Sequence, residues 1–220
     1  MHAFLRIFSR YNWKGIIPGM LFFGSFILLL NACRQEKFQW QTGDLIFQDL
    51  DCPLCKAIEN ATTGYQNKPV SHMGIIYIRQ DTVYVIEAYD GVQLTPLDSF
   101  LHRSPKIMAG RLKPPYRKFI PQAIRNALQK TGLPYDDEFA LNNGKYYCSE
   151  LVHDAFVDGD GKPIFSIQPM NFKNLSTGKI DSIWTDYFSR LGIPVPQGKP
   201  GCNPAAYSRS EKLDILYTTY

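Results

Sequence analysis

The segment SHMGIIYIRQDTVYVIEA, residues 71–88, decides the fold of this 220-residue chain. Its two runs, 72–79 and 82–88, are rich in Ile, Val and Tyr, and the polar pair Gln80-Asp81 separates them. Runs of this composition on either side of two polar residues predict a β-hairpin with a two-residue turn.

The register of this hairpin brings two ionisable side chains together. With Arg79 paired to Thr82, Gly74 faces Glu87, and His72 lies diagonally from Glu87 on the same face. That face also carries the apolar residues Ile76, Ile78, Val83 and Val85. Because burying a carboxylate and an imidazole is costly, we expect the two to pair or to take part in chemistry. The alternative is a purely structural His–Glu pair at a sheet edge.

The remaining segments predict a mixture of short strands and helices. Short apolar runs indicate strands at 44–48, 92–94, 107–112 and 213–217. Helical patterns indicate helices at 54–63, 97–102, 121–130, from Cys148 onward, and at 181–191. Strands clustered in the middle of the chain with helices around them predict an α+β domain with an antiparallel sheet.

Cys148 lies in the segment YYCSELV, residues 146–152, where a loop turns into a helix. The first N–H groups of a helix have no partners within it and carry partial positive charge, which favours a thiolate. We therefore expect a lowered pKa and a nucleophilic role for this thiol. The alternative is a small buried hydrophobic residue, because Cys148 shares an apolar helical stripe with Leu151, Val152, Ala155 and Phe156.

Cys148, His72 and Glu87 together are the residue types of a cysteine hydrolase. His72 would take the thiol proton, Glu87 would orient the imidazole, and the thiolate would attack a carbonyl carbon. Gly74 leaves space beside His72, so we expect the helix of Cys148 to pack on the hairpin face that carries His72 and Glu87.

The other cysteines leave several interpretations open. Cys52 and Cys55 favour a local disulfide or buried thiols, although Cys55 at a helix start is a rival nucleophile. The pair also has the spacing of a redox motif and of zinc ligands. No second Cys/His pair accompanies it, so no metal and no cofactor is predicted. Cys202 has no assigned partner.

The N-terminal segment resembles a bacterial lipoprotein signal. Residues 1–32 combine a basic flank, a short apolar run and a small residue before Cys33, which would be lipidated. An uncleaved anchor is the alternative. We expect a tether at 33–42 and one domain at 43–220.

Charge excludes one class of partner. Removing residues 1–32 takes away three of the 24 basic residues and none of the 20 acidic ones, which leaves a net charge of +1. The sequence therefore gives no indication of nucleic-acid binding.

Four motifs occur in order: GDLIFQ (43–48), SHMGI (71–75), VIEA (85–88) and YCSELV (147–152). Together they resemble the permuted papain-like amidases of the YaeF/YiiX kind, within the NlpC superfamily of cysteine hydrolases. The resemblance implies a circularly permuted papain-like fold, in which an antiparallel sheet packs against the nucleophile-bearing helix. It also implies Cys148 as nucleophile, His72 as base and Glu87 as the orienting acid.

The expected function is an exported, membrane-tethered cysteine hydrolase that cleaves an amide of a cell-envelope peptide through a thioester. One alternative is a lipid acyl hydrolase or acyltransferase that uses the same triad. Another is a non-catalytic module that binds an envelope peptide. Gln48 and Tyr135 are candidate cleft residues without an assigned role.

Overall fold

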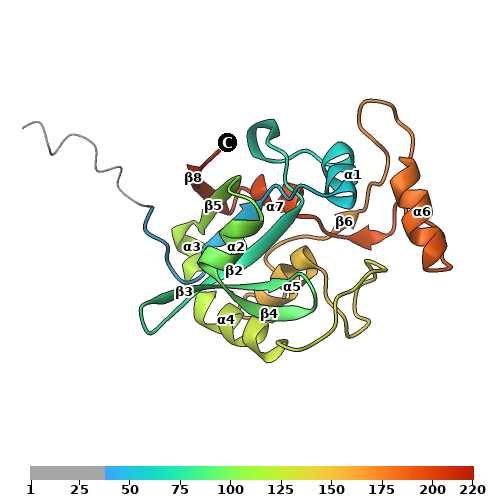
Figure 1. Cartoon of the computed structure of the whole chain (residues 1–220). Helices are drawn as coiled ribbons and strands as arrows, with labels where there is room; N and C mark the ends of the chain where they lie inside the picture. Colours follow the sequence, from blue (N-terminus) through green and yellow to red (C-terminus); the bar gives the residue numbers. More distant parts are fainter. Residues whose placement is uncertain (1–37) are drawn as a thin grey trace, which may run out of the picture. The chain divides into compact units, whose positions relative to one another are not determined.

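A six-stranded antiparallel sheet forms the centre of the computed structural model, which describes residues 38–220 (Figure 1). The residues from Gln39 to Tyr220 form one compact unit. The strand order across the sheet is β4 (Val92–Pro96), β3 (Thr82–Ala88), β2 (His72–Arg79), β1 (Leu45–Gln48), β5 (Ile107–Leu112) and β8 (Leu213–Thr218).

The β2–β3 hairpin has the predicted register. Arg79 pairs with Thr82 and Ile75 with Ile86. The turn residues Gln80 and Asp81 have φ angles of +48° and +58°. Positive φ at both central positions is the requirement of a type I′ turn, whose twist suits a hairpin. The prediction is confirmed.

Helices surround the sheet. They are α1 (Pro53–Ala61), α2 (Leu97–Arg103), α3 (Pro114–Arg117), α4 (Ile120–Gln129), α5 (Cys148–Ala155), α6 (Ser182–Arg190) and α7 (Pro204–Ser208), together with a 3₁₀ turn at Tyr65–Asn67. A second, two-stranded sheet pairs β6 (Gln168–Pro169) with β7 (Pro200–Gly201). The α+β prediction is confirmed, and α3, α7 and the small sheet are additions to it.

The two faces of the large sheet bury different clusters. One face carries Phe47, Met73 and Ile75 in the main core, where Leu151 and Val152 of α5 also lie. The other face carries a smaller cluster that contains Ile46, Ile76, Val85, Phe100 and Ile107. Successive residues of a strand point to opposite faces, so His72 and Gly74 share the face of Ile76.

The expectation that α5 packs on the face of His72 and Glu87 is wrong. The helix covers the opposite face, with Met73 and Ile75, and α2 covers the face of His72 through Phe100. The space beside Gly74 is filled within the sheet, because a Cβ added at Gly74 would lie 2.3 Å from a methyl carbon of Val85. That face therefore has no room for α5 next to His72.

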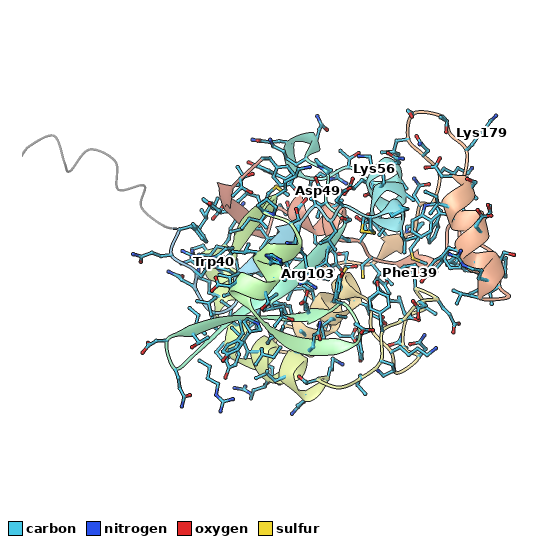
Figure 2. The ribbon with its side chains drawn as sticks, in the orientation of Figure 1. Trp40, Asp49, Lys56, Arg103, Phe139 and Lys179 are labelled. Atoms are coloured by element: carbon cyan, nitrogen blue, oxygen red, sulfur yellow. A yellow bond between two sulfur atoms is a disulfide. The ribbon has the colours of Figure 1, made fainter. Side chains whose placement is uncertain are left out.

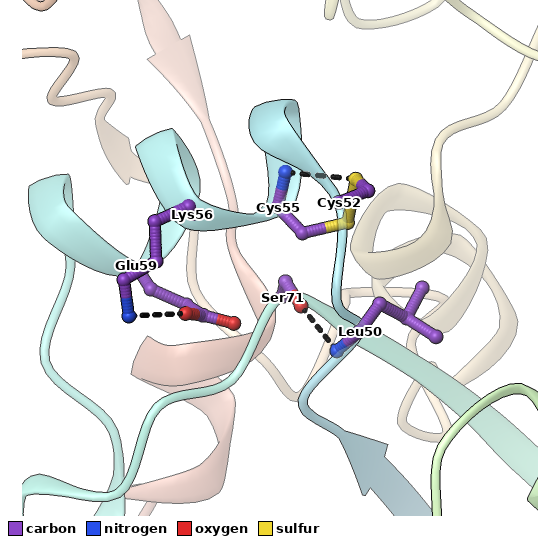
Figure 3. The surroundings of a disulfide bond; sticks show 6 residues. All are labelled: Leu50, Cys52, Cys55, Lys56, Glu59 and Ser71. Carbon is purple, nitrogen blue, oxygen red and sulfur yellow. Dashed lines mark hydrogen bonds and ion pairs between the residues drawn. A yellow bond between two sulfur atoms is a disulfide. The ribbon is translucent and has the colours of Figure 1, made fainter.

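Cys52 and Cys55 form a disulfide at the start of α1 (Figure 3). The backbone N–H of Cys55 donates a hydrogen bond to Cys52 Sγ at 3.0 Å, so Cys52 caps the helix. The disulfide interpretation is confirmed, and in this state Cys55 is not a rival nucleophile.

Residues 1–37 lie outside the described part of the chain, so the predictions for the signal at 1–32 and for Cys33 fall outside it. Within residues 38–220, no helix is both long enough and apolar enough to cross a lipid bilayer.

Candidate active site

His72 and Glu87 form a buried ion pair at one end of the hairpin. His72 Nε2 lies 2.6 Å from Glu87 Oε2, and the two residues are only 4% and 0% exposed. His72 begins β2 and Glu87 lies near the end of β3, so the antiparallel register sets their distance. The imidazole also packs on Phe100, with ring centroids 5.8 Å apart, and edge-on to Tyr89 at 5.6 Å.

Arg103, which Figure 2 labels, is the last residue of α2 and contacts Glu87 of this pair. Its Nη2 donates to both carboxylate oxygens of Glu87 at 2.7 Å. The guanidinium carbon lies 4.1 Å from the ring centre of Tyr89 and 4.7 Å from that of Phe100. Sequence reasoning missed Arg103. The available signal was a carboxylate expected to be buried, together with an arginine directly after the helix predicted at 97–102.

The partners of Glu87 decide its charge. Burial acts to raise the pKa of the carboxyl group, but the hydrogen bond and charge of His72 and the charge of Arg103 outweigh it. The pKa of Glu87 is therefore lowered from its ordinary value, and the group is ionised at neutral pH.

Cys148 is the first residue of α5 and is 5% exposed, with a free thiol. Burial raises its pKa to about 12, although hydrogen bonds from the backbone of Met73 and of Ser149 act to lower it. The expectation of a lowered pKa is wrong. The desolvation of the thiolate in this buried position exceeds the stabilisation that the helix N-terminus supplies.

The contact with Met73 shows where the thiol lies relative to the ion pair. Met73 follows His72 directly in β2. The thiol of Cys148 therefore contacts the strand at the residue next to His72. The charge of Glu87 also acts on the thiol and raises its pKa. The thiol therefore lies beside the start of β2, next to the residue that follows His72.

A pocket opens beside Cys148 and encloses about 540 Å³, including its mouth. Its lining comes from α1, from the loop before α5, from α6 and from the segment that leads into α7. Tyr135 belongs to the lining, as expected. Gln48 does not, because it is fully buried and donates to the carbonyl oxygens of Phe100 and Ser104 at 2.9 and 2.7 Å.

The second free thiol, Cys202, lies in the same pocket wall. Its sulfur lies 3.3 Å from the hydroxyl of Tyr147, and its backbone N–H donates to the same oxygen. Burial raises the pKa of Cys202 to about 11, so this thiol is also neutral at physiological pH.

Two other histidines lie apart from the pair. His153 Nδ1 bonds to the carbonyl oxygen of Phe165 at 2.7 Å, and His102 is exposed. In the part of the chain that the structure describes, no three His, Cys, Asp or Glu residues gather closely enough to hold a metal ion.

Comparisons with known proteins show which family the chain belongs to. Residues 39–217 match the model of a family described as permuted papain-like amidase enzymes, YaeF/YiiX, C92 family. The uncharacterized protein YiiX of Escherichia coli strain K12 is 31% identical over 195 residues, which cover 86% of this chain and 91% of YiiX.

A solved structure is similar as well. The crystal structure of a protein described as metalloprotein YiiX, from Escherichia coli O157:H7, superposes with a TM-score of 0.71 at 25% identity. The match covers 83% of this chain and 99% of that one. The resemblance that the four motifs indicated is confirmed, and the chain belongs to the permuted papain-like amidase family of YaeF and YiiX.

Proposed function

We propose that this protein is a cysteine hydrolase that cleaves an amide bond, with Cys148 as nucleophile, His72 as general base and Glu87 as the orienting carboxylate. The observation that carries the proposal is the contact of the Cys148 thiol with the backbone of Met73, beside the buried His72–Glu87 pair. A free thiol at the start of α5 that also lines a pocket is accessible to a substrate held there.

The raised pKa of Cys148 sets the order of events. The resting thiol is neutral, so His72 must take its proton as Sγ attacks the carbonyl carbon. The imidazolium that forms is stabilised by ionised Glu87, which Nε2 already contacts. His72 then gives the proton to the leaving amine, and a thioester to Cys148 remains. Water attacks the thioester with the help of His72, which releases the acid and restores the thiol.

The start of α5 supplies donors for the oxyanion of the tetrahedral intermediate. The side chain of the residue before the helix, Tyr147, makes no capping hydrogen bond. The backbone N–H of Cys148 is one of the first N–H groups of the helix, which have no partner within it, and so is a natural donor to an oxygen that develops charge next to Sγ.

We further propose that the substrate belongs to the cell envelope and that a lipid on Cys33 holds the enzyme at a membrane. The Cys52–Cys55 disulfide supports export, because disulfides persist in oxidising compartments and are rare in the cytosol. An amide in an envelope peptide is the first substrate class to test. The apolar wall of the pocket favours a second class, lipid acyl groups, which the same three residues would hydrolyse or transfer.

Hydrolysis of acyl p-nitroanilides by the purified protein tests the catalytic assignment. We expect turnover in the wild type, none in Cys148→Ser and none above background in His72→Ala. A Cys52→Ser, Cys55→Ser double variant is the control, because it removes two cysteines that lie outside the pocket lining and should retain activity. A wild type that binds envelope peptides without any turnover would favour the non-catalytic module.

A further inference from the structure

We propose that the pocket beside Cys148 binds an uncharged, apolar group on the acyl half of the substrate, such as a benzyl group or a short alkyl chain. The inference rests on the proposed function, because the acyl carbon must reach Cys148 Sγ. It goes further by naming the chemical class of the acyl group that the pocket binds.

Aromatic rings form one wall of the pocket. Phe172 and Trp184 pack edge to face, with ring centroids 4.8 Å apart and planes at 89°. Phe139 lies edge-on to Trp184 at 6.2 Å and edge-on to Tyr147 at 5.4 Å. Phe139, Phe172 and Trp184 are each at least 90% buried, and their mutual contacts hold the wall in place.

The remaining lining is also suited to apolar contact. Ile58 of α1, Met170 and Pro204 add aliphatic surface. Among the described residues that line the pocket, none is Asp, Glu, Lys, Arg or His. An ionised substrate group would lose its hydration there without gaining a counter-charge, which disfavours its binding.

Most polar side chains in the wall already have partners within the chain; Ser149 Oγ and Trp184 Nε1 are buried without one. Asn171 Nδ2 donates to the carbonyl oxygens of Ala61 and Lys173 at 2.8 Å. Asn203 Oδ1 accepts from the N–H of Ala206 and caps α7, and Thr62 Oγ1 donates to the carbonyl oxygen of Ile58. These groups maintain the local backbone and are not free to replace the water around a charged ligand.

The pocket has room for a group of this size. It encloses about 540 Å³ together with its mouth. A flat ring or a short chain in it would bring apolar atoms against Phe172 and Trp184.

Chloromethyl ketones, R–CO–CH₂Cl, test this inference without a known substrate. Cys148 Sγ displaces chloride to form a thioether, His72 takes the thiol proton, and R occupies the position of the acyl group. The probes carry benzyl, pentyl, carboxyethyl or aminobutyl as R. The readout is the second-order rate of labelling at Cys148, located by peptide mass mapping, because Cys202 lines the same pocket. We expect the benzyl and pentyl probes to react at least about tenfold faster than either charged probe.

A substitution in the pocket lining should shift the preference from apolar probes toward a cationic probe. Ile58→Glu places a carboxylate in the lining and should slow the benzyl probe about tenfold while accelerating the cationic aminobutyl probe. Ile183→Glu is the matched control, because Ile183 is exposed on α6 outside the lining, and it should change neither rate.

The outcomes separate the two proposals. Equal rates for all four probes, with labelling of Cys148 still lost in His72→Ala, would overturn the apolar pocket and leave the catalytic assignment intact. Rates for Ile58→Glu that match those of Ile183→Glu would also overturn it. Absence of labelling at Cys148 by every probe would overturn both proposals.

Discussion

Arg103 Nη2 lies 2.7 Å from both carboxylate oxygens of Glu87, and one of these oxygens also contacts His72 Nε2. The arginine sits on the rings of Tyr89 and Phe100, which hold its guanidinium in place. In the proposed mechanism Arg103 touches neither substrate nor thiol. It acts through Glu87, as a positioning residue that keeps this carboxylate ionised and correctly oriented for His72.

Arg103→Ala should therefore lower kcat about 10- to 100-fold and change its pH dependence. Loss of the cation removes one of the effects that lower the pKa of Glu87, so this pKa rises and the acid limb of the kcat profile moves to higher pH. Arg103→Lys should restore part of the activity. Arg125→Ala, which removes an exposed arginine of α4, is the control. A profile that keeps its shape in Arg103→Ala would limit Arg103 to a structural role.

Glu87→Gln should retain weak activity, whereas Cys148→Ser should have none. The amide can still bond to His72 but supplies no charge to stabilise the imidazolium, so kcat should fall by roughly 10²- to 10⁴-fold. Steady-state kinetics and circular dichroism of both variants check this. Wild-type kinetics in Glu87→Gln would remove Glu87 from the site.

The Cys148 thiol should behave as a weak acid in the free enzyme. Because burial raises its pKa to about 12, its alkylation by iodoacetamide should accelerate continuously from pH 6 to pH 10. Labelling followed by mass spectrometry at each pH measures this. A plateau already present below pH 7 would instead indicate a preformed thiolate paired with His72.

Glu150 should make the stability of the domain depend on pH. Burial, the largest cause, raises its pKa from 4.5 to about 7, and the residue is only 1% exposed. The folded state therefore binds a proton that the unfolded state has lost, so this contribution to stability is complete below pH 4.5 and is lost as pH rises through 7. At pH 8, Glu150→Gln should be more stable than the wild type by on the order of 1–3 kcal/mol. The difference should shrink toward pH 5 in urea denaturation, and the exposed Glu211→Gln should show neither effect.

The hairpin and its His72–Glu87 contact could be predicted because they depend on local information. A two-residue turn and strict alternation fix the register, and the register fixes the distance between the side chains. The helix start at Cys148 was also predictable from its apolar stripe.

The apolar stripe had indicated the burial of Cys148, but the position of Arg103 and the face that α5 covers could not be predicted in this way. Each depends on which side of the sheet a helix packs, and hairpin periodicity is compatible with helices on either face. The state of Cys52 and Cys55 could not be predicted for a different reason. Their spacing alone permits a disulfide, free thiols or metal ligands.

The acyl-enzyme tests the central claim most directly. The wild type should be incubated with an activated acyl donor, quenched in acid during turnover and analysed by intact and peptide mass spectrometry. The account predicts one acyl group in thioester linkage to Cys148, absent from Cys148→Ser and strongly reduced in His72→Ala. Turnover that proceeds with no acyl group on Cys148, or with the group on Cys202, would contradict it.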